Sequence, residues 1–437
     1  MNLSETVKRA GVVGAGGAGF PAHIKLEQGA DWYLANGAEC EPLVRKDVEL
    51  MIRYPREIVS GLRLAANAVG ASKMTIGVKA KNTEAIRALQ SVSEDGSIGI
   101  HQFGDFYPSG DEYELVYSIT GQLIPPAGIP LEIGVVVNNV ETLFQIHQAS
   151  KGVPVTETFM TVAGNVVRPF TAWIPVGMRI SEVLELAGGA TVDDFAIMES
   201  GLLMGTLVQD LSQPVSKTTA GLIVLPSTHN LIQRYRTPVE AMARIGKSAC
   251  DQCSYCTELC PRYLLGYDVQ PHAVMRSLGF SATGSKIWNQ YAMLCCGCGI
   301  CTLYACPEAL YPREACLKGI DDLEAARMKW EGPSEIKVHP MKEFRRVPMK
   351  QLMSRLGVSH LESEAPYKEL TTEPKTVIIP LEHRVGCTAH PVVQAGEQVT
   401  KGQLVAEPEA GELGSACHAS ISGRVTSIER AIHIEKG

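Results

Sequence analysis

Two runs of cysteines constrain this chain more than any other feature. The first run, CDQCSYCTELCP, has the spacing C-x2-C-x2-C-x3-C-P, and the second, CCGCGICTLYACP, has one extra residue before its last cysteine. Thiolates with this spacing bind [4Fe–4S] clusters, and in two-cluster proteins the cysteine before proline ligates the other cluster. The runs therefore predict two clusters with crossed ligation. The predicted ligands are Cys250, Cys253, Cys256 and Cys306 for the first cluster, and Cys295, Cys298, Cys301 and Cys260 for the second.

Zinc and disulfide bonds explain these runs less well. A structural zinc site uses four ligands, commonly as two C-x2-C pairs, and leaves the two triplets unexplained. Disulfides indicate an oxidising compartment, and the N-terminal MNLSETVKRAGVVGAGG lacks the apolar core of a secretory signal. Cys296 remains an alternative to Cys295, although the C-x2-C spacing favours Cys295. Cys316 falls outside the pattern and is expected to be a buried structural thiol.

The size and charge of the chain narrow the class of protein. A chain of 437 residues is too long for one core and predicts roughly three or four domains. A net charge of −7, with Lys and Arg not clustered into a stripe, argues against a nucleic-acid-binding surface. The best candidate for a membrane helix, LIPPAGIPLEIGVVVNNV, is interrupted by prolines, glycines and a glutamate. Thirteen cysteines in this setting fit a reducing cytoplasm.

The N-terminal segment GAGGAGFPAHIK carries four closely spaced glycines, Gly14, Gly16, Gly17 and Gly19. Glycines at this density let backbone N–H groups approach an anion closely, as a phosphate-binding loop requires. A plain tight turn explains the same glycines equally well. No apolar strand of useful length precedes the segment, so it does not follow the Rossmann pattern.

Three more polar segments, NGAECEP, YPSGDE and NNVET, follow in the N-terminal third, where apolar strands alternate with helical patterns. That alternation predicts an α/β layer. Taken together and in this order, the four segments resemble the FMN- and NADH-binding segments of the flavin-carrying subunit of respiratory complex I and of the C subunit of the Rnf electron-transport complex. A flavin suits the predicted clusters, because it accepts a two-electron hydride and releases electrons singly.

The resemblance implies FMN and NADH as ligands, with Lys25 and Glu41 as catalytic residues. The first segment then holds the FMN phosphate and ring and forms the nicotinamide face. The second lines the isoalloxazine and NADH pocket, the third lies beside it, and the fourth lies on the flavin phosphate side. Ala38 stands where the complex I subunit has an acidic residue, which leaves the flavin contacts there open. The implied cofactor-binding residues are Gly14, Gly16, Gly17, Gly19, Phe20, Lys25, Asn36, Glu39, Glu41, Gly110, Asp111, Glu112, Asn138, Asn139 and Thr142.

Two later segments indicate small β-rich units. FMTVAGNVVRPFTAWIPVGMRISEVLELAGG predicts short strands and one helix in a β-grasp pattern and resembles the SLBB domain of the same family, a scaffold without chemistry of its own. The C-terminal VQAGEQVTKGQLVA and HASISGRV predict an all-β unit and resemble the two halves of a biotinyl/lipoyl-type barrel-sandwich hybrid. Glu409-Ala-Gly-Glu412 stands where a carrier domain has its modified lysine, which argues against a swinging-arm role.

The predicted fold is therefore multidomain α+β. Its parts are an α/β FMN/NADH-binding domain over residues 1–150, an SLBB-like β-grasp domain over 153–230, a helical ferredoxin-type dicluster domain over 236–335, a linker over 336–374 and an all-β barrel-sandwich hybrid over 375–437. The linker carries four basic residues, which are expected on a solvated surface, with a docking face as the alternative. These residues are Lys342, Arg345, Arg346 and Lys350.

The order of the domains and the lack of a membrane helix narrow the resemblance to the soluble cobalamin reductases of propanediol-utilisation microcompartments. The implied activity is electron transfer from NADH through FMN and two clusters to cobalamin. The implied location is the cytoplasm, inside or on a microcompartment, with a shell protein as a further partner. No D-x-H-x-x-G motif marks a corrin site. Two alternatives stay open: an Rnf-C-type protein that delivers electrons to a partner protein, and a scaffold whose flavin loops have decayed.

Overall fold

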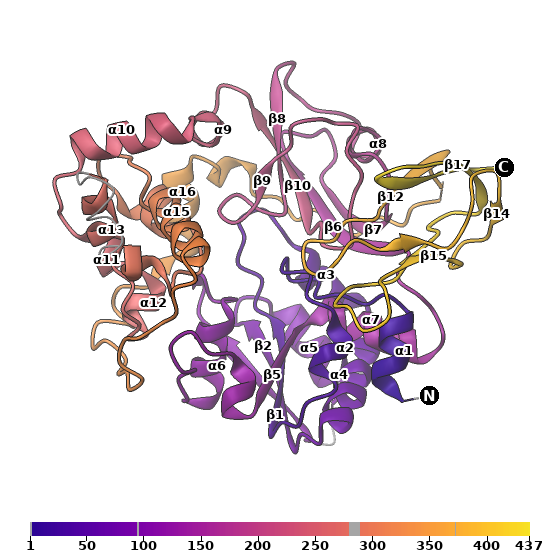
Figure 1. The fold of residues 1–437 in the computed structure, drawn as a ribbon, viewed down its shortest axis with the longest axis horizontal. Helices are drawn as coiled ribbons and strands as arrows, with labels where there is room; N and C mark the ends of the chain where they lie inside the picture. Colours follow the sequence, from indigo (N-terminus) through magenta and orange to yellow (C-terminus); the bar gives the residue numbers. More distant parts are fainter. Residues whose placement is uncertain (1, 94–95, 279–288, 372) are drawn as a thin grey trace.

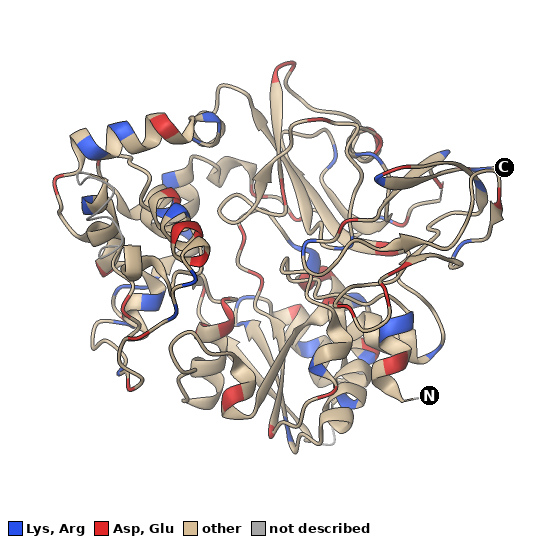
Figure 2. Cartoon of the chain, in the orientation of Figure 1, with Lys and Arg blue, Asp and Glu red and all other residues tan. Residues whose placement is uncertain are grey.

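The computed structural model describes residues 2–93, 96–278, 289–371 and 373–437. In Figure 1 an N-terminal α/β unit lies at the bottom, the helical unit that carries the cysteines on the left, a mixed sheet at the top and an all-β unit on the right. This arrangement confirms the predicted multidomain α+β fold. Figure 2 shows Lys and Arg interspersed with Asp and Glu over all four units.

A four-stranded parallel sheet with the order β3-β2-β1-β5 forms the centre of the N-terminal unit. Successive side chains of β1 face opposite sides of the sheet. Tyr33 and Ala35 pack with helices α4 and α7, whereas Leu34 packs with α6. The bounds are β1 (Trp32–Gly37), β2 (Lys73–Lys79), β3 (Ile98–Phe103), β5 (Val135–Asn139), α4 (Pro55–Val69), α6 (Glu112–Thr120) and α7 (Val140–Ser150).

The α4 helix shows how the sequence builds this unit. It begins at Pro55, whose fixed φ suits the first helical turn, and it ends before Gly70, which has a left-handed φ of 73°. A Cβ atom on Gly61 would lie 1.9 Å from the Leu143 carbonyl oxygen, so only glycine lets α4 pack this closely against α7. The shorter helices are α1 (Leu3–Arg9), α2 (Ala22–Lys25), α3 (Lys46–Arg53) and α5 (Thr83–Gln90).

The second unit is a five-stranded mixed sheet with the order β7-β6-β10-β8-β9 and one helix packed against it. The β6 and β10 strands pair in parallel, and the other neighbouring strands pair antiparallel. The predicted β-grasp pattern is therefore confirmed. Its elements are β6 (Glu157–Gly164), β7 (Phe170–Pro175), α8 (Ile180–Leu186), β8 (Phe195–Glu199), β9 (Thr206–Leu207) and β10 (Gly221–Pro226).

Short helices hold the cysteine runs. Pro261 directly follows Cys260 and begins α12, because proline at the first helical position lacks only a donor that the helix does not use. Cys260 therefore stands at the entrance to that helix. The elements are α9 (Asn230–Arg236), α10 (Val239–Ala249), α11 (Tyr255–Glu258), α12 (Pro261–Leu264), α13 (Pro271–Ser277), η2 (Gln290–Ala292), η3 (Cys301–Ala305), α15 (Pro312–Ala325) and α16 (Met349–Leu356).

Two small antiparallel sheets form the C-terminal unit. Alternate residues of its strands, such as Val377 and Ile379 in β12 and Ile432 and Ile434 in β18, fill one buried core. The predicted all-β unit is confirmed. Its strands are β12 (Thr376–Pro380), β13 (His390–Pro391), β14 (Gln398–Val399), β15 (Leu404–Glu407), β16 (Cys417–His418), β17 (Gly423–Ile428) and β18 (Ala431–Glu435).

The segment before the C-terminal unit returns to the N-terminal one. The strand β11 (Val347–Pro348) pairs with β4 (Phe106–Tyr107) of the first unit. Lys342 is 3% exposed, and its ammonium lies 2.8 Å from the Glu114 carboxylate. The expectation that Lys342 lies on a solvated surface is therefore wrong. The partner that buries it is far away in the chain, so the local sequence gives no sign of the pairing.

Candidate functional site

The glycine-rich segment forms a loop with unused backbone donors. The Gly14 N–H donates to the Phe20 carbonyl over 2.8 Å and closes the loop. Gly17 and Gly19 have φ values of 103° and 73°, which favour glycine. Free backbone donors on such a loop fit the phosphate of a bound FMN. Within the described chain, the N–H groups without an acceptor here are those of Gly16, Gly17 and Ala18.

The fourth segment anchors this loop to the edge of the parallel sheet. The Ala15 N–H donates to Thr142 Oγ1 in α7 over 3.0 Å. A Cβ atom on Gly16 would lie 3.5 Å from the Asn139 Cβ atom at the end of β5. Ligands of open α/β sheets bind at the carboxyl ends of the strands. The structure thus brings the glycine loop, Asn139 and Thr142 together where a ligand is expected.

Lys25, one of the two predicted catalytic residues, ends helix α2 after the glycine loop. Its ammonium donates to the Val137 carbonyl over 2.8 Å and lies 3.6 Å from the Glu112 carboxylate. The two charged side chains are 32% and 40% exposed, so both are open to a ligand. A residue of the first segment therefore lies next to a residue of the third.

Asn36 lies at the carboxyl end of β1 and connects two of the other segments. Its side-chain amide donates to the Gly110 carbonyl over 2.9 Å, and its backbone carbonyl accepts from the Asn139 side chain over 3.3 Å. Asn138 differs from its neighbour. Its amide donates to the Tyr33 hydroxyl in the core over 2.6 Å, so the structure does not bring this side chain to the glycine loop.

A buried charge network that the sequence did not reveal supports this edge. The Lys46 ammonium lies 2.7 Å from the Asp47 carboxylate and 2.8 Å from the Glu141 carboxylate, and all three residues are buried. Asp47 also accepts from the Asn139 side chain over 2.7 Å, and its N–H donates to Glu39 over 3.3 Å. Burial, followed by the Asp47 charge, raises the pKa of Glu39 to about 8. Glu39 therefore holds a proton at neutral pH.

Glu41, the other predicted catalytic residue, binds a loop of the β-grasp unit. Its carboxylate accepts from the N–H groups of Leu202, Leu203 and Met204 over 2.8, 3.0 and 2.9 Å. A Cβ atom on Gly201 would lie 2.4 Å from Glu41 Cδ, so the loop requires glycine there. Burial raises the pKa of Glu41, and the three N–H donors oppose that shift. Glu41 thus anchors this loop, and its catalytic role stays a prediction.

Asp111 joins the third segment to the cysteine-bearing unit. It caps α6 by accepting from the N–H groups of Tyr113 and Glu114 over 3.1 and 3.2 Å. Its second carboxylate oxygen lies 3.0 Å from the guanidinium of Arg262. Arg262 follows Cys260 by two positions in the chain. One ion pair therefore connects a predicted flavin-binding segment with the neighbourhood of a predicted cluster ligand.

The structure brings the first predicted group of cysteines together. Burial, followed by the nearby thiols of Cys306, Cys250 and Cys253, raises the pKa of Cys256 to about 12. Cys306 thus lies with the cysteines of the first run, as crossed ligation requires. Cys253 is exposed, so this group extends to the molecular surface. The role of each thiol as a ligand stays a prediction.

The second predicted group gathers in the same way. Burial and then the Cys295 thiol raise the pKa of Cys260, and burial followed by Cys295 and Cys260 raises the pKa of Cys301. Cys298 is also buried, and Cys260 and Cys301 act on its thiol. Buried thiols of raised pKa are costly to ionise, and bound iron compensates the thiolate charge. This donor set therefore fits an iron–sulfur cluster.

Two more thiols lie beside the second group. Cys316 is fully buried, as predicted, and its hydrogen bond with Cys295 is the main cause that lowers the pKa of Cys295 to about 7. Cys296 interacts with Cys298, and this interaction is the main cause that raises the pKa of Cys298. Both Cys295 and Cys296 thus reach the group, and the choice between them as ligand stays open.

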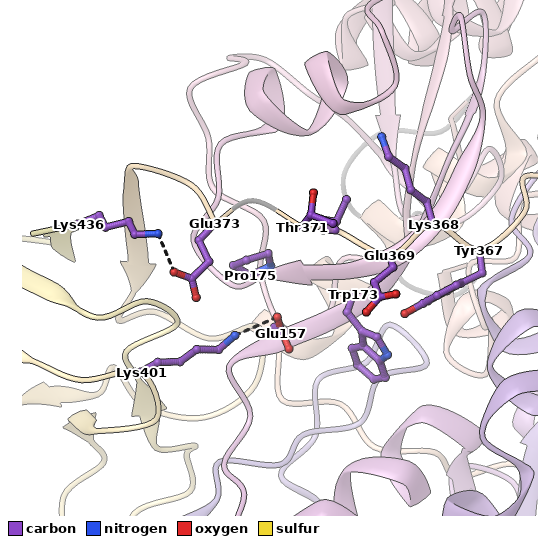
Figure 3. Close-up of a pocket in the computed structure, with 11 residues that line it drawn as sticks. Glu157, Trp173, Pro175, Tyr367, Lys368, Glu369, Thr371, Glu373, Lys401 and Lys436 are labelled. Carbon is purple, nitrogen blue, oxygen red and sulfur yellow. Dashed lines mark hydrogen bonds and ion pairs between the residues drawn. The ribbon is translucent and has the colours of Figure 1, made fainter.

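A separate cavity of about 600 Å³ lies between the β-grasp and C-terminal units, on the other side of the molecule from the cysteines (Figures 1 and 3). Trp173 lines it, and an ion pair of 3.1 Å between Lys401 and Glu157 connects the two units across it. A second pair, Lys436 with Glu373 at 3.0 Å, lies at its rim. Among the described residues, no predicted site residue lines this cavity.

Comparison with known proteins assigns each unit to a family. Residues 7–148 match the Nuo51 FMN-binding domain, 159–198 the SLBB domain, 249–311 the 4Fe-4S dicluster domain and 359–437 the RnfC barrel sandwich hybrid domain. The cobalamin reductase PduS of Salmonella typhimurium is 41% identical over 437 residues, which cover 100% of this chain and 96% of that protein. The corresponding protein of Citrobacter freundii is 40% identical and is covered to 97%.

The chain belongs to the cobalamin reductase PduS family. The RnfC-like component of the Na⁺-translocating ferredoxin:NAD⁺ oxidoreductase complex of Acetobacterium woodii is 34% identical to this PduS family member over 60% of the chain and 58% of that component. An NAD⁺-reducing [NiFe]-hydrogenase structure shares the fold, with a TM-score of 0.50 and 21% identity over 76% of this chain and 64% of that one.

This member of the PduS family is a flavo-iron–sulfur electron-transfer oxidoreductase, and its cofactors are FMN and [4Fe–4S] clusters. The predicted family, enzyme class and cofactors are confirmed. In the described part of the chain, every helix is too short or too polar to cross a membrane. The exact domain boundaries and the individual cofactor-binding residues stay predictions.

Proposed function

We propose that this chain oxidises NADH and passes the electrons through FMN and two [4Fe–4S] clusters to the cobalt of cobalamin. The 41% identity to a cobalamin reductase over the full length supports the acceptor. The FMN-binding domain supports entry of electrons as a hydride. When FMN is bound, it takes up two electrons together and releases them singly, which one-electron clusters require.

The residues at the sheet edge give FMN and NADH their binding site in this proposal. The free N–H groups of the glycine loop and the half-exposed ammonium of Lys25 bind phosphate. The flavin ring lies against the edge that Asn36 and Asn139 form. Glu39, protonated at neutral pH, adds no negative charge where an anionic nucleotide binds.

One observation carries the proposed direction of electron flow: the flavin-binding segments contact the second cysteine group. The Tyr107 hydroxyl donates to the Cys298 carbonyl over 2.8 Å, and Asp111 pairs with Arg262 over 3.0 Å. The cluster bound by Cys260, Cys295, Cys298 and Cys301 is therefore the entry cluster in this proposal.

The first cysteine group is then the exit cluster. Cys256 of the first group is among the charges that act on Cys301 of the second, so the two groups are neighbours. Cys253 of the first group is exposed. A cluster close to the surface can reduce an acceptor in solution without a deep corrin pocket.

A second candidate function is electron delivery to a partner protein. The 34% identity to one component of an Na⁺-translocating complex, over 60% of this chain, favours this alternative. In that case the exposed edge at Cys253 docks a protein and not cobalamin. A microcompartment location and a shell-protein partner are further expectations from the family resemblance.

An anaerobic absorbance titration tests the proposal. The FMN-loaded, cluster-reconstituted chain is titrated with NADH, in parallel with NADPH, and then with cob(III)alamin. We expect NADH to bleach the flavin and cluster bands and cob(III)alamin to restore them. Lys25→Met should weaken FMN or NADH binding, whereas Lys151→Met, on an exposed residue that follows α7, is the matched control.

The remaining outcomes separate the alternatives. If NADH bleaches the bands and cobalamin leaves them bleached, the acceptor is a partner protein. If NADH changes neither band in a chain that has bound FMN and iron, the proposed function is wrong.

A further inference from the structure

Arg262 occupies a buried position between the flavin-binding unit and the second cysteine group. It lies in the first turn of α12, directly after Cys260 and Pro261, and it is 8% exposed. Its Nη2 atom lies 3.0 Å from Asp111. Its guanidinium stacks on the ring of Tyr113 at 3.5 Å, an arrangement that favours a cation. Two contacts to the flavin-binding unit therefore fix one side of this side chain.

The other side of the guanidinium has unused donors. The Nε and Nη1 atoms of Arg262 are fully buried, and neither finds an acceptor within the described chain. Arginine carries five N–H donors and cannot be deprotonated, so buried N–H groups of this kind require an acceptor.

The nearby thiols identify that acceptor. Cys296 acts on Arg262, and Arg262 is among the charges that act on Cys295. The free donors thus lie beside the space that the second cysteine group surrounds. Sulfur atoms of an iron–sulfur cluster accept hydrogen bonds, and such bonds set its potential.

We propose that Arg262 donates hydrogen bonds to the sulfur atoms of the cluster held by Cys260, Cys295, Cys298 and Cys301, and thereby raises its reduction potential. This proposal rests on the proposed function, because it uses the assignment of the second group as a cluster site. It adds a role to a residue that is neither a ligand nor part of the flavin-binding segments.

The physical basis is the charge of the reduced cluster. When one electron passes from the donor to the cluster, the cluster gains one negative charge, and Arg262 gains or loses no proton. A guanidinium at close range in a medium of low dielectric stabilises that added charge. The Asp111 carboxylate, 3.0 Å from the guanidinium, opposes part of the effect. The cluster next to the flavin is therefore the easier one to reduce, and electrons enter there.

A redox titration of the cluster-loaded full-length chain tests the proposal. The titration uses dithionite and mediators, with electron paramagnetic resonance as the readout, so it does not depend on NADH. In Arg262→Gln we expect one of the two cluster potentials to shift to more negative values and the other to stay unchanged. Arg262→Lys keeps the charge but loses the planar fork, so its shift should be smaller.

Two further variants give the test a sign and a control. Asp111→Asn removes the opposing carboxylate, so the same potential should shift to more positive values. Arg345→Gln is the matched control, because Arg345 lies in the neighbouring segment, is 27% exposed and pairs with Glu258 over 3.2 Å. We expect no shift in this control.

Iron and sulfide contents make the outcomes distinct. Unchanged potentials in Arg262→Gln with both clusters retained would overturn the proposal. If Arg262→Gln loses a cluster, Arg262→Lys and Asp111→Asn decide, and the absence of a shift in both also overturns it. A wild-type chain that binds only one cluster contradicts the two-cluster assignment itself, which is a failure of the proposed function.

Discussion

The hydroxyl of Tyr107 donates a hydrogen bond of 2.8 Å to the backbone carbonyl of Cys298. The tyrosine is 2% exposed and belongs to a segment of the flavin-binding unit, whereas Cys298 is a predicted cluster ligand. Burial, followed by the Glu41 charge, raises the pKa of Tyr107 well above its ordinary value. The hydroxyl therefore keeps its proton and stays the donor in neutral and alkaline solution. This contact holds the two redox-active units together at one point.

Tyr107→Phe should weaken this junction. The change leaves the buried Cys298 carbonyl without its donor, which costs about 1–3 kcal/mol of unfolding free energy. We expect slower transfer from FMN to the clusters in rapid-mixing absorbance experiments, with NADH-dependent ferricyanide reduction unchanged. Tyr304→Phe, which removes an exposed hydrogen bond to Gln351, is the control. Wild-type stability and transfer rates in Tyr107→Phe would contradict this prediction.

Glu41→Gln should destabilise the β-grasp loop. The carboxylate accepts three backbone N–H groups, and the NH₂ group of glutamine cannot accept any. An unpaired buried N–H costs about 1–3 kcal/mol, which urea unfolding will measure. If stability is unchanged while NADH oxidation is lost, Glu41 acts in catalysis, as the family resemblance implies, and its anchoring role is minor.

Substitution of the adjacent cysteines should identify the ligand. The C-x2-C spacing predicts that Cys295→Ser loses one cluster, whereas Cys296→Ser keeps both. Iron and sulfide analysis after reconstitution measures the difference. The reverse result would assign the ligand to Cys296 and leave Cys295 paired with the buried Cys316.

The stability of the protein should fall in mild acid because of His418. Burial, followed by the Lys217 charge, lowers its pKa from 6.5 to about 3. Below pH 6.5 the unfolded chain takes up a proton that the folded protein does not bind. This histidine therefore removes about 1.4 kcal/mol of stability per pH unit below 6.5, or about 2 kcal/mol at pH 5.

His418→Gln should flatten the pH dependence of urea unfolding between pH 7 and pH 5. His390→Gln is the control, because the side chain of His390 is 59% exposed. Equal slopes for wild type and His418→Gln would show that the buried imidazole does not control acid stability.

Local motifs predicted much of this molecule, and contacts between distant segments account for what they missed. The structure gathers the cysteines that the spacing had grouped, because a short spacing fixes which thiols can meet. The four N-terminal segments converge, because strands of a parallel sheet end at one edge. The pairing of Arg262 with Asp111 joins positions 151 residues apart. No periodicity or motif marks such a contact, and packing between units alone creates it.

The Lys46 network shows the same limit within one unit. Lys46 and Asp47 read as part of a polar turn in the sequence, yet both are buried against Glu141, which is 95 residues from Lys46. Buried charges are stable only as pairs, and the partner becomes visible only in the fold.

NADH-driven reduction of cob(III)alamin by three preparations of the chain tests the central claim most directly. The preparations carry FMN and clusters, clusters without FMN, and FMN without clusters. We predict rapid reduction by the first preparation and only background rates for the other two. Equal rates with and without clusters would contradict the claim, because the electrons would then reach cobalt from the flavin and bypass the cysteine groups.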